Sequence, residues 1–129
     1  MRISREHEVT TRPAGATFTG GVWRTDFIVP GPDEGLAGSR FLYAPGARSF
    51  WHIHAQEQAI IAVLGNGIVA WEGSDGPQVL HVGDWWHVVP GVPHWHGATP
   101  DTSFAHLAVT AGGGTTWLHE VSDEEYRGR

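Results

Sequence analysis

Short segments with the composition of β-strands follow one another along almost the whole chain. They consist of alternating or β-branched residues, and turn-forming pairs such as Pro45-Gly46 and Pro90-Gly91 separate them. Segments bounded in this way are typical of antiparallel strands joined by tight turns. The segments that we identify are residues 17–29, 39–43, 49–54, 58–64, 67–72, 78–82, 85–89 and 103–110. Many short strands of this kind predict an all-β sandwich or barrel.

The length of the chain, 129 residues, is that of one ordinary domain. We find no repeat, linker or change of composition that would divide it, so we expect residues 1–129 to form a single domain. Helix is predicted only near the end, where Ser122-Asp123-Glu124-Glu125 has the pattern of a capping box. Ser122 is the expected N-cap and Glu125 the expected N3 residue of a short C-terminal helix.

Charge and composition exclude several classes of function. The formal net charge is −6, and all eight basic residues are arginines. We therefore expect neither nucleic acid nor a membrane as a partner. Without lysine or cysteine, the chain can form no Schiff base, thiolate nucleophile or disulfide. The first fifteen residues lack the apolar core of a signal peptide, and the longest aliphatic run, residues 59–64, is too short to cross a membrane. A soluble, cytoplasmic protein is expected.

Two His-x-His pairs are the strongest chemical signal. His52-Ile53-His54 lies within a predicted strand, and His94-Trp95-His96 follows about forty residues later. Alternate residues of a strand point to the same face, so each pair places two imidazoles together. Histidine is abundant in this chain, with nine residues, and such a tripeptide also arises by chance. A cluster of histidines with a purely structural role is therefore the alternative to a metal site.

The residues around these pairs carry a family resemblance. Glycines at 46 and 65 bracket the first pair, and Gly83 with Pro90-Gly91 precedes the second. Residues 46–65 and 83–98 thus resemble the two motifs of the cupin superfamily. The resemblance implies a single-domain cupin β-barrel of the jelly-roll type, with one divalent metal ion inside it. The metal ligands that it implies are His52, His54, Gln58 and His94.

One departure from the cupin pattern concerns the fourth ligand. The family usually has glutamate where this chain has Gln58. Glu57 could take that role after a shift of register, although in a regular strand it would face away from the pocket. With Gln58, all the protein ligands are neutral, so a divalent ion keeps its full charge. Such a site favours anions and Lewis-acid chemistry over higher oxidation states. Its ligands suit Mn, Fe, Zn, Ni or Co.

Two further histidines are candidates for proton transfer. His106 lies in the late segment Phe104-Ala105-His106-Leu107-Ala108 and could act as a general base. A core histidine bonded to a backbone carbonyl is the alternative. His96 shares strand parity with His94 and could be an extra ligand, a proton shuttle or a group that supports the ligands. Five tryptophans could form a substrate cage, or a core or subunit interface: Trp51, Trp71, Trp85, Trp86 and Trp95.

Within the cupins, the chain resembles a group of small bacterial proteins that includes the cupin-type hydroxynitrile lyases. The matching stretches are 45–54, 93–100, 105–108 and 119–126; Thr110 stands where that group carries a glutamine. In these lyases a metal held by three His and one Gln binds cyanide or the cyanohydrin, and a nearby histidine moves the proton. Carried over, the resemblance implies His106 as the base, with His96 close by. It favours a non-redox metal-dependent lyase that acts on a small molecule.

Two other functions and one assembly state complete the expectations. A cupin dioxygenase or an aromatic-ring cyclase is one alternative function, and a metal- or ligand-binding protein without turnover is the other. A homodimer or homotetramer is expected, because small barrels have exposed strand edges and seven tryptophans exceed the needs of one core.

Overall fold

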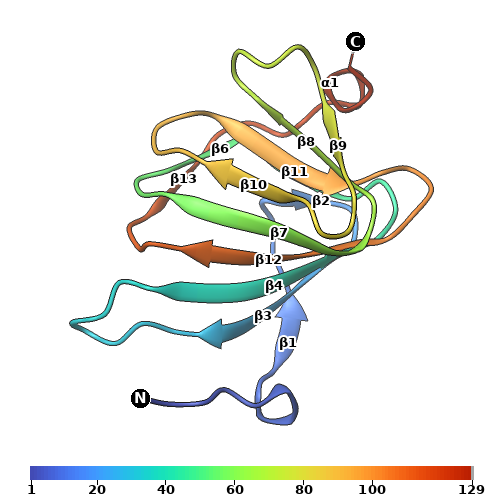
Figure 1. Ribbon diagram of the computed structural model, residues 1–129. Coiled ribbons are helices and arrows are strands. Elements are labelled where there is room, and N and C mark those ends of the chain that lie inside the picture. The colour runs from blue at the N-terminus through green and yellow to red at the C-terminus, as the bar shows by residue number, and fades with distance from the viewer. Residues whose placement is uncertain (129) are drawn as a thin grey trace.

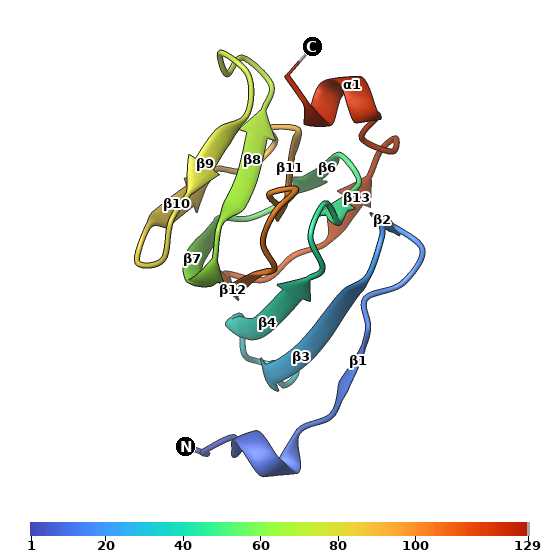
Figure 2. The ribbon, with the colours of Figure 1, turned by 90° about the vertical axis from the view of Figure 1, so that its right-hand side faces the viewer.

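The computed structural model of the chain describes residues 1–128, and these form two antiparallel sheets that face each other (Figure 1, Figure 2). The first sheet has the strand order β1 (Thr11–Pro13), β3 (Val22–Ile28), β4 (Ala37–Tyr43), β12 (Phe104–Thr110), β7 (Gln58–Gly65) and β10 (Trp85–Val88). The second has the order β13 (Thr115–Trp117), β6 (His52–His54), β11 (His94–Ala98), β5 (Arg48–Ser49) and β2 (Phe18–Thr19), with β8 (Gly67–Trp71) paired to β11 and β9 (Gln78–Leu80) paired to β8.

In the described part of the chain, helix is confined to two short elements at opposite ends of the molecule (Figure 1). A single 3-10 turn, Glu6–Glu8, precedes β1, and α1 (Asp123–Tyr126) follows β13. The predicted capping box is present: the Ser122 hydroxyl accepts from the Glu125 backbone N–H, and the Glu125 carboxylate accepts from the Ser122 backbone N–H. The predicted all-β fold with a short C-terminal helix is therefore confirmed. Within residues 1–128, no helix is both long and apolar enough to pass through a membrane.

Two predicted segments are interrupted in the structure. The segment 17–29 breaks into β2 and β3 at Gly20, whose φ of 80° lies in the left-handed region that favours glycine. The segment 49–54 divides because the chain changes partner: β5 pairs with β2, whereas β6 pairs with β13. Strands β1, β11 and β13 were not among the predicted segments. Strand β11, His-Trp-His-Gly-Ala, lacks the β-branched residues on which that prediction relied.

The hydrophobic core has two parts, one on each side of the second sheet. The larger part lies between the sheets and includes Tyr43, Ile60 and Phe104. The smaller part lies beneath α1 and joins Trp95 with Tyr126 and Val121. Because alternate residues of β11 point to opposite faces, Trp95 enters the smaller core while His94 and His96 point between the sheets. The two sheets thus enclose the side chains that carry the chemistry.

Candidate metal centre and cavity

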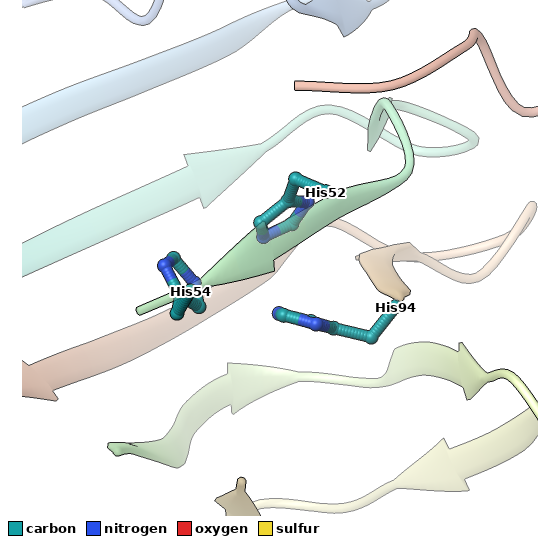
Figure 3. A group of neighbouring side chains, drawn as sticks. All are labelled: His52, His54 and His94. Atoms are coloured by element: carbon teal, nitrogen blue, oxygen red, sulfur yellow. The ribbon is translucent and has the colours of Figure 1, made fainter. Parts of the chain in front are cut away.

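Three histidines converge between the sheets. His52 and His54 lie on one face of β6, and His94 of β11 is the direct cross-strand partner of His52. All three are buried, and the ligand nitrogens that they offer lie within 4.8 Å of one another. Figure 3 shows the two rings of β6 on their strand and His94 reaching toward them from its own strand. The three residues could therefore hold one metal ion.

Hydrogen bonds orient the three rings in the same sense. Each Nδ1 lies near an oxygen atom: His52 Nδ1 is 2.8 Å from Phe50 O, His94 Nδ1 is 2.9 Å from Val92 O, and His54 Nδ1 is 3.2 Å from Thr115 Oγ1. A carbonyl oxygen can only accept, so Nδ1 of His52 and of His94 carries the proton and donates it. Their Nε2 lone pairs are then free for a ligand. The Nε2 atoms of His54 and His94 are buried without any hydrogen-bond partner among the described residues. Metal-binding nitrogens have this property, because their lone pairs are reserved for the ion.

Gln58, at the start of β7, offers a fourth donor atom to the same site. It is buried and lines one cavity together with His52 and His54. Its Nε2 donates to Thr110 Oγ1 at 3.1 Å, while its Oε1 is buried without a partner. The amide therefore presents an unsatisfied oxygen, which is the atom that binds a divalent metal. Glu57 is exposed and its Oε2 lies 2.6 Å from Nε2 of the exposed His87, so it faces away from the cavity.

Burial keeps these three histidines neutral. It lowers the pKa of His94 to about 4 and lowers the pKa of His52 well below its usual range. The pKa of His54 is also lowered by burial, although the neighbouring Gln58 side chain opposes that effect. Metals bind the neutral form of imidazole. Together with the free oxygen of Gln58, the residues present fit a divalent metal ion.

A cavity of about 450 Å³ opens onto His52, His54 and Gln58. Phe18, Phe41 and Trp117 supply aromatic walls, and the Trp117 ring lies 4.8 Å from that of His52 between centroids. None of the five tryptophans considered as a cage lines this cavity. Two of them, Trp71 and Trp86, line a separate cavity on the other side of His94. Trp117 was missed because its strand is only three residues long, too short to show an alternating pattern.

His96 and His106 also line the cavity, and a buried tyrosine links them. The hydroxyl oxygen of Tyr43 lies 2.6 Å from His96 Nδ1 and 3.0 Å from His106 Nε2. The other nitrogen of His106, Nδ1, lies 3.2 Å from the carbonyl oxygen of Leu107. Burial lowers the pKa of His106 to about 4 and lowers the pKa of His96 well below its usual range. Tyr43 was not identified from the sequence.

The comparisons with known proteins agree with this geometry. The model of the cupin domain family matches residues 39–110. An (R)-mandelonitrile lyase from Granulicella tundricola is 40% identical over 131 residues, which cover 98% of this chain and 99% of that protein. A crystal structure of a cupin-like protein from Thermotoga maritima superposes with a TM-score of 0.81 at 30% identity, covering 96% of this chain and 90% of the other.

A more distant solved structure shares the fold alone. The polyketide cyclase RemF from Streptomyces resistomycificus has a TM-score of 0.77 at 16% identity, covering 98% of this chain and 91% of that one. The family match spans more than half of the chain and includes both histidine pairs. The resemblance to cupins that the two motifs carry is therefore confirmed, and the chain belongs to the cupin family.

Proposed function

We propose that this cupin is a metal-dependent, non-redox lyase that cleaves or forms the carbon–carbon bond of small aromatic cyanohydrins. The observation that carries the proposal is the donor set: three neutral histidines whose ligand nitrogens lie within 4.8 Å of one another, and the free amide oxygen of Gln58, which lines one cavity with His52 and His54. Among the described residues, Glu57 is turned outward, and the one acidic side chain that lines the cavity, Glu34, is paired with Arg2 at 3.0 Å. A site of this kind attracts anions.

A divalent ion fits His52, His54, Gln58 and His94, and when bound it supplies Lewis-acid stabilisation of negative charge on a substrate oxygen or nitrogen. The protein contributes the orientation of these donors. Phe50 O and Val92 O fix two of the rings, and Thr110 fixes the amide. Donors held in this way need little rearrangement during the reaction.

Proton transfer is assigned to the histidine pair His96 and His106. Both are neutral near pH 7 because burial lowers their pKa values, so the pair can accept a proton. In the cleavage direction, the pair accepts the hydroxyl proton of the cyanohydrin. The bond to the nitrile carbon then breaks with its electron pair as the carbonyl forms. The proton is returned to the departing cyanide, so that the products are an aldehyde and hydrogen cyanide.

The cavity supports an aromatic substrate. Phe18, Phe41 and Trp117 offer apolar surface beside His52 and His106. A volume of about 450 Å³ lies within the range of small-molecule sites. The relative that is 40% identical carries the name (R)-mandelonitrile lyase, and mandelonitrile combines one phenyl ring with a cyanohydrin. Mandelonitrile is therefore the first substrate to test.

The test compares oxygen and metal requirements. The protein is loaded with manganese or with zinc, its metal content is measured, and release of benzaldehyde from mandelonitrile is followed in air and under argon. We expect cleavage in both atmospheres and with both metals, and no cleavage by the double variant His52→Ala/His54→Ala. An oxygenase is the second candidate function, because this chain belongs to the cupin family and one solved cupin neighbour is an oxalate oxidase. Turnover that needs oxygen, or that vanishes while zinc is bound, would favour it and reject the lyase.

A further inference from the structure

Tyr43 lies at the centre of a buried row of hydrogen bonds that the proposed reaction does not yet use. Its hydroxyl contacts His96 on one side and His106 on the other, at 2.6 Å and 3.0 Å. Tyr43 and His106 are fully buried, and His96 is 4% exposed. The row ends at the carbonyl oxygen of Leu107, which lies 3.2 Å from His106 Nδ1.

The direction of every hydrogen bond in this row follows from its end. The Leu107 carbonyl can only accept, so His106 Nδ1 donates to it. A neutral imidazole has one N–H, so His106 Nε2 accepts, and the donor must be the Tyr43 hydroxyl. That hydroxyl has a single proton, so toward His96 its oxygen accepts from Nδ1–H. The Nε2 of His96 then carries no proton and presents its lone pair as an acceptor.

The surroundings favour this neutral arrangement. Burial lowers the pKa of both histidines and raises the pKa of Tyr43 well above its usual value. Ser49 Oγ accepts from the backbone N–H of His96 and, among the described residues, makes no hydrogen bond to the ring. His96 lines the cavity, and its Nε2 has no hydrogen bond to the described residues. Both ring nitrogens of His106, in contrast, are occupied within the protein.

We propose that Tyr43 is a positioning residue: its hydroxyl holds His96 in the Nδ1–H tautomer, so that His96 Nε2, and not a nitrogen of His106, is the hydrogen-bond acceptor offered to a substrate hydroxyl. His106 acts through Tyr43, because its Nε2 accepts the hydrogen bond that the Tyr43 hydroxyl donates. The tyrosine oxygen can then only accept a hydrogen bond from His96. The catalytic meaning of this inference rests on the proposed lyase function. The tautomers themselves do not depend on it.

The decisive measurement is the tautomer of each ring, read from ¹⁵N–¹H correlation spectra of histidine-labelled protein, metal-free and loaded with zinc. We expect a protonated Nδ1 and a bare Nε2 in both His96 and His106. Zinc should change the ¹⁵N chemical shift of Nε2 in His52, His54 and His94 by coordination. The ¹⁵N chemical shift of His96 Nε2 should show no such change. Protonated Nε2 on His96 in the parent protein, or a coordination shift there, would overturn the inference. This part needs no variant and no activity.

The variant Tyr43→Phe keeps the ring in the core and removes only the hydroxyl. We expect it to change the tautomer of His96 and to lower kcat at least about tenfold with little change in KM, since general-base catalysis contributes about 10²–10⁴-fold. The matched control is Tyr126→Phe, which removes another buried tyrosine hydroxyl, one that donates to Ala98 O at 2.6 Å beneath α1. The control should keep the tautomers and the kcat of the parent.

The outcomes separate the two proposals. If Tyr43→Phe and Tyr126→Phe have equal kcat values while the parent turns over mandelonitrile, Tyr43 is not a positioning residue. If the parent has the expected tautomers but cleaves no cyanohydrin, the lyase function fails and the assignment of the hydrogen bonds stands.

Discussion

The side chain of Gln58 donates from Nε2 to Thr110 Oγ1 across 3.1 Å, and this contact fixes the orientation of the amide in the cavity that Gln58 lines with His52 and His54. The amide oxygen is left buried and without a partner. Thr110 is the direct cross-strand partner of Gln58 in the pairing of β12 with β7. The residue that departs from the hydroxynitrile lyase pattern at position 110 therefore supports the donor set in this chain.

The first prediction concerns that contact. Thr110→Val keeps the branched shape but removes the oxygen that accepts from Gln58, so the amide loses its orientation. We expect the affinity for zinc to fall by about 10–100-fold, the usual effect of losing a group that orients a metal ligand. Competition with a chromophoric chelator measures it. Thr116→Val, on the exposed next strand, is the control and should bind zinc like the parent. Equal affinities for the two variants would contradict the role of Thr110.

The second prediction concerns the choice between Gln58 and Glu57. His52→Ala and His94→Ala should each lose stoichiometric metal in elemental analysis, because two imidazoles and one amide are a poor site. Gln58→Glu should retain the metal, since a carboxylate is also a ligand. Glu57→Gln should change nothing, because Glu57 pairs with His87 at the surface. Loss of metal from Glu57→Gln, with metal retained by Gln58→Ala, would make Glu57 the ligand.

The third prediction concerns His106. His106→Ala should keep the fold and the metal but lose about 10²–10⁴-fold of the turnover. Without His106, the Tyr43 hydroxyl has no acceptor on that side and can turn its proton toward His96. The control is His81→Ala, at an exposed position outside the cavity. Turnover by His106→Ala within about twofold of the parent would remove His106 from the machinery.

The fourth prediction is a dependence of stability on pH in the metal-free protein. Burial lowers the pKa of His94 and of His106 from 6.5 to about 4, so the unfolded chain takes up protons first as the pH falls. The stability due to these neutral groups is complete above about pH 6.5 and is lost progressively down to about pH 4. At about pH 5, the free energy of unfolding should be lower by roughly 2 kcal/mol for each of them. Urea unfolding at several pH values measures this, and a flat profile between pH 7.5 and 5 would contradict it.

Part of the site could be predicted from the sequence because it depends on local alternation. His52 and His54 share one face of their strand, and Ile53 lies on the other, because successive side chains of a strand point to opposite faces. The rest depends on register between distant strands. His106 pairs with Phe41, and Phe104 pairs with Tyr43, so Tyr43 reaches His106 only through a pairing of residues some sixty positions apart.

The fold could be predicted more completely than the site for a physical reason. Turn residues and strand-like segments indicate a two-sheet protein without reference to any particular register. A hydrogen bond such as that from Gln58 to Thr110 requires one register, and no local pattern contains it. The split of residues 49–54 into β5 and β6 is a similar case, because it follows from a change of partner strand.

The last prediction concerns assembly, which we propose to be a homodimer formed through the outer face of the six-stranded sheet. Leu107 pairs with Ile61, and Trp85 pairs with Ile61 on the same face. The exposed large apolar side chains of this face include Trp23, Leu42, Val63, Trp85, Leu107 and Val109. Apolar side chains exposed on five strands of one face are typical of a surface that binds another protein. Leu107→Glu should therefore give a monomer in sedimentation velocity at micromolar concentration, whereas Val79→Glu, at an exposed apolar position on β9 of the other sheet, should leave the dimer intact. A parent protein that sediments as a monomer, or a Leu107→Glu variant that remains dimeric, would show that this face is not the interface.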